Sequence, residues 1–324
     1  MASSSVNSAL QATYDVLIIG GSAAGLSAAL MLRRSLRKVL VIDGGQPCNR
    51  YTPHSHGFMT RDGETPAQLL ALAKAQAVAY STVTFLASFV TNIAQNGSGF
   101  VVQTDERGAF FARRVLLATG VEDLMPPIEG FAECWGKSVL HCPYCHGYEV
   151  HSQPLGLLGN GDAGYELVRL TQNWSKDLTL FTNGLSTLSA EQQRQVQQLG
   201  IPLIESPISR IEHENGLMRA VYFQDGSRVP LTAMFARVPF RHHTNLAEQI
   251  GCEITATGLI SVTEFGQTTV PGVFAAGDNS SPMRQITMAS ASGVKAGSWI
   301  NRELIDEDLV AMLSTELKTE TRPA

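Results

Sequence analysis

The strongest constraint on the fold is a pattern that occurs twice: a short apolar run, a glycine-rich turn, a helix and a second apolar run. The first copy spans residues 14–42 and the second spans residues 154–181. Each copy predicts one βαβ unit of a parallel sheet. A chain of 324 residues is long enough for about two domains. We therefore expect an α/β protein with two Rossmann-like dinucleotide-binding domains, the second inserted in the first.

Composition and charge exclude several classes of protein. The formal net charge is −5, so no overall positive field favours nucleic acid. Apolar runs stay below the roughly 18 residues needed to span a membrane. Five cysteines are too few for a disulfide scaffold, and the first residues lack the pattern of a secretory signal. We expect a cytoplasmic protein with a disordered leader over residues 1–13 and a mobile tail over about the last dozen residues.

The first glycine turn has the spacing of a dinucleotide-binding turn, with one substitution. Gly20, Ser22 and Gly25 occupy the three glycine positions of GxGxxG, so serine replaces the middle glycine. This position must be small because the backbone approaches a pyrophosphate, which the N-terminus of the next helix can bind. Asp43 ends the second strand, where a carboxylate can accept a ribose hydroxyl. The alternative is an ordinary glycine turn in an α/β domain.

The second glycine turn is complete, but the strand after it lacks the charges expected of an NADPH site. Residues 159–164 are Gly-Asn-Gly-Asp-Ala-Gly, between a predicted strand and a predicted helix. A domain selective for NADPH places Arg or Lys near the end of the next strand, to meet the 2′-phosphate. Thr182, Asn183 and Gly184 occupy that place. The sequence predicts the fold here without indicating that NADPH is bound.

Two cysteines separated by two residues are the clearest candidates for catalysis. Cys142 and Cys145 lie in the segment His-Cys-Pro-Tyr-Cys-His. This spacing favours a redox-active dithiol, because one turn can close a small disulfide loop. A zinc site and a c-type haem attachment share parts of the pattern. Zinc usually needs a second ligand pair and haem attachment requires export, so we predict no metal site.

His146 follows the second cysteine directly. A histidine there can donate a proton to a departing thiolate or take one from an attacking thiol. The alternative is that it caps or packs the turn, which we expect of His141. Cys48, Cys134 and Cys252 are isolated in sequence and are expected to be buried or incidental thiols.

The order of these motifs resembles the low-molecular-weight thioredoxin reductases and related flavin-dependent disulfide reductases. The chain carries, in order, the first glycine turn, Ala-Thr-Gly at 118–120, the cysteine pair, the second glycine turn and Ala-Ala-Gly-Asp at 275–278. The resemblance implies FAD in a split domain formed by residues 1–124 and 247–324. It also implies an inserted NAD(P)H-type domain that carries the dithiol, residues 125–246, and a homodimer.

The resemblance assigns roles by motif. It implies that Cys145 contacts the flavin, that Cys142 attacks the partner disulfide, and that His146 replaces an acid common in these reductases. The residues that it places at FAD are Gly20, Ser22, Ala24 and Gly25 at the pyrophosphate, Asp43 at the adenosine ribose, Gly45 and Gln46 after it, Ala118, Thr119 and Gly120 along the cofactor, Gly277 and Asp278 at the ribityl end, and Arg284, Gln285 and Ile286 beside the isoalloxazine.

Three departures from the common pattern bear on function. His146 and the segment 48–63 make the chain similar to gliotoxin-type dithiol oxidases. The absence of Arg or Lys at residues 182–184 makes it similar to the ferredoxin-dependent flavin thioredoxin reductases. We predict an FAD-dependent thiol-disulfide oxidoreductase that passes electrons between flavin, the Cys142–Cys145 pair and a partner disulfide.

Three interpretations stay open on the sequence alone. The first is a reductase of thioredoxin or another small disulfide, with NADPH, ferredoxin or another molecule as donor. The second is a dithiol oxidase that runs the same relay in reverse, with oxygen as acceptor. The third is a flavin-binding protein without turnover, against which the intact cysteine pair argues.

Overall fold

The structure is a computed structural model that describes residues 13–320. The expected leader at residues 1–13 falls outside this range except for Thr13, which begins the first strand. Most of the tail that was expected to be mobile is helical, and its mobility stays a prediction. The last helix, α8 (Ile286–Glu320), continues through this region, and only residues 321–324 lie beyond the description.

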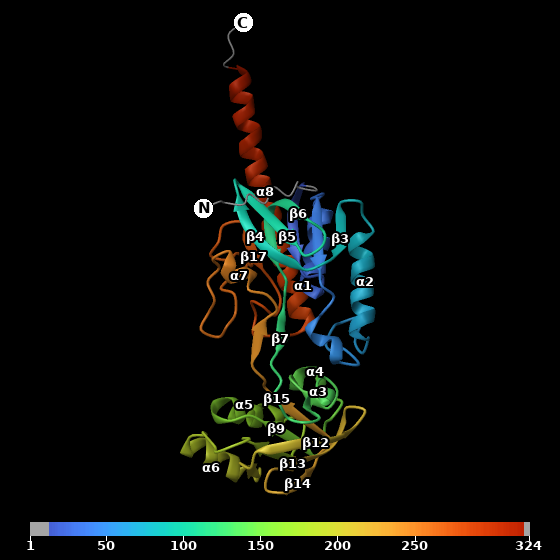
Figure 1. The fold of residues 1–324 in the computed structure, drawn as a ribbon, viewed down its shortest axis with the longest axis vertical. Coiled ribbons are helices and arrows are strands. Elements are labelled where there is room, and N and C mark those ends of the chain that lie inside the picture. Colours follow the sequence, from blue (N-terminus) through green and yellow to red (C-terminus); the bar gives the residue numbers. More distant parts are fainter. Residues whose placement is uncertain (1–12, 321–324) are drawn as a thin grey trace, which may run out of the picture. The chain divides into compact units, whose positions relative to one another are not determined.

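The chain divides into two compact units (Figure 1). Unit 1 consists of Met1–Pro47, Gln68–Val121 and His242–Ala324, and unit 2 consists of Cys48–Ala67 and Glu122–Arg241. Unit 2 is therefore inserted in unit 1, as the sequence predicts. The inserted unit also takes in the short segment 48–67.

Unit 1 is built on a seven-stranded sheet with the order β3-β2-β1-β6-β5-β4, and β17 also pairs with β6. The strands are β1 (Thr13–Ile19), β2 (Val39–Asp43), β3 (Val83–Ala87), β4 (Val90–Asn96), β5 (Gly99–Thr104), β6 (Ala109–Leu117) and β17 (Val273–Ala275). The strands β1, β2, β3 and β17 form parallel ladders, whereas β4, β5 and β6 form an antiparallel meander. The parallel strands are continuous apolar runs because helices cover the sheet.

From the sequence, residues 83–90, 99–104 and 109–112 are expected to form antiparallel strands, and residues 114–118 a separate strand. Two of these expectations are wrong. Residues 83–90 were expected to pair antiparallel with the strands that follow, but β3 pairs parallel with β2 and β4 begins at Val90. Residues 109–112 and 114–118 were expected to be separate strands, but β6 is one strand of nine residues. Arg113 lies inside this strand because its guanidinium is paired with carboxylates, so the polar residue does not mark a turn.

Helices α1 (Ala23–Arg34) and α8 lie side by side in unit 1 (Figure 1). Their backbones approach closely: a methyl group on Gly293 would overlap the carbonyl oxygen of Ala24. One turn further along, a methyl group on Gly297 would lie 3.1 Å from the carbonyl oxygen of Ala28. The apolar faces of α1 and α8 pack with the strands in one buried core, which includes Leu26 of α1 and Leu304 of α8.

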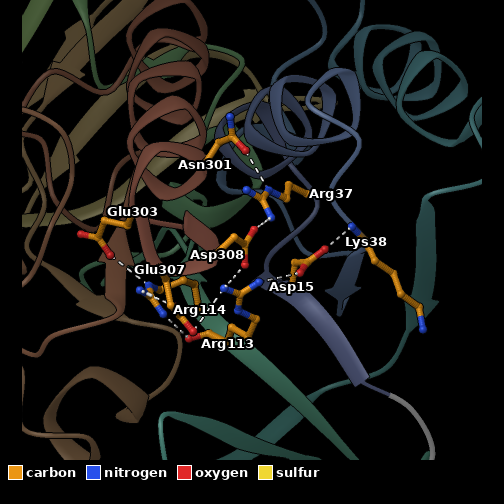
Figure 2. Close-up of polar contacts among 9 residues, drawn as sticks. All are labelled: Asp15, Arg37, Lys38, Arg113, Arg114, Asn301, Glu303, Glu307 and Asp308. Atoms are coloured by element: carbon orange, nitrogen blue, oxygen red, sulfur yellow. Dashed lines mark hydrogen bonds and ion pairs between the residues drawn. The ribbon is translucent and has the colours of Figure 1, made fainter. Parts of the chain in front are cut away.

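The middle of α8 is tied to the sheet by a network of charges (Figure 2). Arg113 on β6 contacts Asp308 at 2.6 Å, Glu307 at 3.1 Å and Asp15 at 3.3 Å. Hydrogen bonds from Arg37 and Arg113 hold the pKa of Asp308 below its ordinary value. The other members of the network in Figure 2 are Lys38, Arg114, Asn301 and Glu303.

Unit 2 contains a parallel five-stranded sheet with the order β11-β10-β9-β15-β8, beside an antiparallel sheet of β12, β13 and β14. Its strands are β8 (Val139–Leu140), β9 (Leu155–Leu158), β10 (Leu178–Phe181), β11 (Leu203–Ile204), β12 (Ile208–Glu214), β13 (Leu217–Phe223), β14 (Arg228–Pro230) and β15 (Ala233–Ala236). Two core clusters fill the unit, one centred on Leu157 and Phe235 and one on Phe131 and Phe223.

The helices of unit 2 are short. They are η1 (Cys48–Tyr51), α3 (Phe131–Cys134), α4 (Pro143–His146), α5 (Gly161–Thr171) and α6 (Ala190–Gln198). The chain passes between the units along β7 (Val121–Asp123) and β16 (Phe240–His242), which pair with each other. Most of α2 (Pro66–Val78) and all of α7 (Leu246–Gln249) belong to unit 1. Within residues 13–320, each helix is too short or too polar to cross a membrane.

Replacing Arg113 with Ala should lower the free energy of unfolding by about 1–2 kcal/mol, because it leaves three carboxylates on α8 and β1 without this partner. The matched control is Lys295→Ala, which removes an exposed ion pair to Glu264 from the same helix and should cost no more than about 0.5 kcal/mol. Denaturant unfolding followed by circular dichroism measures both. Equal losses in the two variants would show that the network does not hold α8.

Candidate functional site

The first glycine turn in unit 1 has backbone contacts that only glycine permits. Gly20 has a φ of +106°, and a methyl group there would overlap the carbonyl oxygen of Ala118. A methyl group on Gly25 would overlap the carbonyl oxygen of Gly20 itself. Ser22 stands at the N-cap of α1 and makes no side-chain capping hydrogen bond. The first turn of α1 is thus left uncapped by this side chain, as an anion-binding helix start requires.

The acid predicted at the end of β2 lies against this turn. One carboxylate oxygen of Asp43 accepts a hydrogen bond from the backbone N–H of Gly21 at 2.9 Å. A carboxylate has acceptor capacity left after one such bond, which a ribose hydroxyl can use. Gly45 and Gln46 follow on an exposed stretch of chain.

The turn after β17 is brought to the same place by α1 and α8. Gly277 is buried, with a φ of +91°, and a methyl group on it would lie 3.1 Å from the Cβ of Ala24. Its N–H donates to the hydroxyl of Ser292 on α8 at 3.0 Å. Asp278 is paired with Arg284 at 3.7 Å. Gln285 and Ile286 follow as half-buried residues where α8 begins.

Sequence analysis missed one residue of this cluster, Asn279. Its side chain is fully buried and its amide donates to Leu117 O at 2.9 Å and to the hydroxyl of Thr119 at 3.3 Å. It therefore joins the Ala118-Thr119-Gly120 strand end to the Gly277-Asp278 turn. The Oδ1 atom of Asn279 is buried and lacks a hydrogen-bond partner among the described residues. Its position next to Asp278 was the only sequence signal.

The cysteine pair lies on a tight turn in unit 2. Cys142 is the extended N-cap residue of α4, Pro143 is its first helical residue, and Cys145 and His146 donate their N–H groups to Cys142 O at 3.1 and 3.2 Å. Both cysteines are half-buried, whereas Tyr144 between them is 68% exposed. The turn therefore presents both cysteines on one short segment, as the CxxC spacing predicts.

His146 lies half-buried beside the pair. Burial lowers its pKa most strongly, Glu149 acts to raise it, and His56 lowers it further. The His56 and His146 rings are 6.1 Å apart between centroids and nearly perpendicular, at 87°. His141 instead packs edge-on against Trp135, in agreement with the packing role expected of it.

The other cysteines differ among themselves. Cys134 and Cys252 are buried, and burial raises the pKa of both thiols, which makes them poor nucleophiles. Cys48 was expected to be incidental, but its sulfur lies 3.3 Å from a carboxylate oxygen of Asp123. Among the described residues, no three His, Cys, Asp or Glu side chains converge as metal ligands would.

The segment 48–67 supplies functional candidates that the sequence did not identify as such. His56 and Asp62 belong to it: His56 approaches Glu149, which follows the cysteine pair, and Asp62 approaches His56. The segment had been recognised as unusual, but its role depends on contacts between residues far apart in the chain.

Comparison with known proteins identifies the family. Residues 14–293 match the pyridine nucleotide-disulphide oxidoreductase family, and the chain belongs to it. It is 32% identical over 316 residues to thioredoxin reductase sirT of Leptosphaeria maculans, covering 92% of this chain and 96% of that protein. It is 33% identical over 305 residues to thioredoxin reductase tcpT of Claviceps purpurea, covering 90% and 94%.

Solved structures agree with this assignment. The structure of HlmI superposes with a TM-score of 0.90 at 35% identity, covering 95% of this chain and 98% of that one. A putative thioredoxin reductase TrxB from Bacillus anthracis gives a TM-score of 0.87 at 32% identity, covering 91% and 99%. The chain is thus a thioredoxin reductase-like flavin disulfide oxidoreductase, which confirms the resemblance and the predicted two-domain Rossmann-type fold.

The residues of unit 1 fit an FAD dinucleotide. Gly20 and Gly25 let the backbone of the turn pack closely at the start of α1, as a dinucleotide-binding turn requires, and Asp43 lies against this turn, where such folds place an adenosine ribose. The unsatisfied Oδ1 of Asn279 is an acceptor that lacks a partner in the protein, as expected of a group that meets a ligand.

Asp278→Ala should weaken FAD retention roughly tenfold, because it removes a charged acceptor at the ribityl end of the expected cofactor. The ratio of flavin to protein absorbance after gel filtration measures the loss. Glu264→Ala, which changes an exposed acid in the same unit, should keep the original ratio. Equal flavin content in both variants would contradict the assignment of Asp278.

Proposed function

We propose that Cys142 and Cys145 form the redox pair of an FAD-dependent thiol-disulfide oxidoreductase, with His146 as the group that moves the proton. The observation that carries this proposal is the α4 turn, which holds both half-buried cysteines beside a half-buried histidine in a member of this family. FAD would be held by the glycine turn, Asp43, the strand end at 118–120 and the turn at 277–278.

The proposed chemistry is two successive thiol-disulfide exchanges. The Cys142 thiolate attacks a partner disulfide, forms a mixed disulfide and releases one partner thiolate, which takes up a proton. The Cys145 thiolate then attacks Cys142 and releases the second partner thiolate, so that the enzyme is left with a Cys142–Cys145 disulfide. The reduced flavin would supply two electrons to return this disulfide to the dithiol, and the oxidised flavin would accept two electrons when the pair runs in reverse. His146 gives or takes the proton at the cysteine sulfur.

In the second glycine turn, in unit 2, the side chain of Asn160 bonds one backbone N–H of the turn and joins it to the loop that follows β10. The Oδ1 atom of Asn160 accepts hydrogen bonds from the N–H groups of Gly161 and Thr187, both at 2.8 Å, and from the Thr187 hydroxyl at 3.1 Å. Its Nδ2 atom donates to Leu185 O at 2.8 Å. A helix-start N–H that could bind a pyrophosphate is therefore already used.

The charge beside this turn also disfavours NADPH. A cavity of about 520 Å³ lies between α6 and β11, next to the loop that follows β10. The charged residue in its lining is Glu205, whose carboxylate accepts the Ser186 N–H at 2.7 Å. A carboxylate repels a 2′-phosphate, whereas a cation would bind it.

These two observations favour a second candidate function, a dithiol oxidase. If NADPH is not the donor, a dithiol substrate can reduce the enzyme disulfide through the reverse of the exchanges above. Oxygen would then accept the two electrons and two protons, which gives hydrogen peroxide. Donation by ferredoxin is a further possibility that the sequence raised and that no contact described here supports.

We propose thioredoxin or another small disulfide as partner, since several relatives carry the name thioredoxin reductase. We also retain the homodimer, the cytoplasmic location and the domain boundaries at 124/125 and 246/247 as proposals. The boundary proposal is supported by the contact-based units, which change at 121/122 and 241/242.

NADPH should reduce the bound flavin poorly. The reason is the internally bonded turn at Asn160 and the lack of a cation at residues 182–184. The test is anaerobic bleaching of the visible flavin absorbance at micromolar NADPH. Rapid bleaching would contradict the prediction.

The two cysteines should not be equivalent. Cys145→Ser keeps the proposed attacking thiolate and should trap oxidised thioredoxin as a mixed disulfide on Cys142, because the resolving thiol is missing. Cys142→Ser should trap much less. Non-reducing electrophoresis and mass spectrometry measure the adduct, and Cys252→Ser serves as a control at a buried thiol. The assigned roles are wrong if Cys142→Ser traps the partner and Cys145→Ser does not.

A further inference from the structure

His56 comes from the segment 48–67, far from the cysteine pair in sequence, yet its ring lies edge-to-face against His146. Both residues belong to unit 2. The His56 side chain is only 22% exposed, so a charge on this ring would be poorly screened by water. Neither His56 nor the two acids beside it, Asp62 and Glu149, has a role in the function proposed above.

Two carboxylates hold the His56 ring in place. Its Nε2 atom lies 3.4 Å from Glu149 Oε1 and its Nδ1 atom lies 3.6 Å from Asp62 Oδ2. The other oxygen of Asp62 accepts the Gly57 N–H at 2.7 Å, which fixes that carboxylate. Each ring nitrogen therefore faces a carboxylate at ion-pair distance, beyond the length of a strong hydrogen bond.

Glu149 is shared between the two histidines. It acts to raise the pKa of His146, whereas burial and His56 act to lower it. A cation at His56 repels a proton on His146 and also draws the Glu149 carboxylate to itself. Both effects oppose protonation of His146.

We propose that His56 is a positioning residue that engages Glu149 and thereby keeps the His146 ring neutral, as the base that takes the proton from a cysteine or substrate thiol. This inference rests on the proposed function, in which the proton moves at the cysteine pair. The proton passes from the thiol to the vacant ring nitrogen of His146 and then to solvent, and the thiolate keeps the electron pair. A neutral His146 suits attack by a thiol, which is the first event when a dithiol substrate is oxidised.

The surroundings of His146 in unit 2 are consistent with this account. On its own turn, the other titratable groups are Cys142, Tyr144 and Cys145, and Glu149 follows shortly after. From the segment 48–67 come His56 and, behind it, Asp62. His151 stacks on Tyr148 instead.

The test is an NMR titration of His146 in protein labelled with ¹³C-histidine, with its Cε1–H signal assigned by its loss in His146→Gln. His56→Gln should move the titration midpoint upward by about half a pH unit or more, because it removes the repelling charge and releases Glu149. Glu149→Gln should move the midpoint downward, because it removes the carboxylate that favours the proton. His56→Lys keeps a cation at this place and should stay close to the unmodified protein.

His54→Gln is the matched control, since its ring bonds to Gly63 O at 2.9 Å in the same segment, and it should leave the His146 titration unchanged. A His56→Gln midpoint that is unchanged or lower would overturn the proposal. Glu149 is exposed, so Glu149→Gln provides an independent test if His56→Gln does not fold, and an unchanged or higher midpoint there would also overturn it.

A second readout links the coupling to the thiols and separates it from the proposed function. The pH dependence of iodoacetamide alkylation of Cys142, in the reduced Cys145→Ser variant, should shift to lower pH when His56→Gln is added, opposite to the His146 titration, because a more basic His146 takes the thiol proton at lower pH. An unshifted alkylation profile would overturn the link between His56 and the thiol. If both cysteine variants keep full turnover while the His146 titration still responds to His56, the proposed function fails and the coupling stands.

Discussion

The close contact between α1 and α8 is the constraint on which unit 1 depends. The first helix lies near the start of the chain and the other at its end, with the whole of unit 2 inserted between them. Glycine at 293 lets the two backbones meet, since any side chain there would overlap Ala24. The same contact brings Gly277 against the first turn of α1, so one packing requirement both closes the split unit and assembles the dinucleotide site. The charge network around Arg113 holds the next part of α8 to the sheet.

Unit 2 repeats the βαβ architecture but uses it differently. Its glycine turn has the same crowding as the first, since a side chain on Gly164 would press on Gly159 O. Asn160 nevertheless bonds the Gly161 N–H of this turn and the N–H of Thr187 with its own side chain. The redox chemistry that we propose for the unit lies instead on the α4 turn. There the segment 48–67 contributes the imidazole of His56, which lies against His146.

Local patterns made much of the fold predictable from sequence. The two glycine turns, α1, the strands of the βαβ units and the CxxC turn are encoded within short stretches, so their residues could be named in advance. Features that depend on contacts between distant segments could not be predicted in this way. Asn279 joins residues 117 and 119, His56 meets His146, and Asn160 bonds to Thr187. The single strand β6 was missed for the same reason, because the acids that neutralise Arg113 come mainly from the far end of the chain.

The central claim is that electrons pass between a dithiol, the Cys142–Cys145 pair and FAD. The most direct measurement is an anaerobic titration of the purified protein with dithiothreitol, followed by the visible flavin absorbance. The account predicts that the flavin is bleached in the unmodified protein and stays oxidised in the Cys142→Ser/Cys145→Ser double variant, which should still bind FAD. Bleaching at the same rate in both proteins would contradict the account, because it would show that the cysteine pair is not in the path of the electrons.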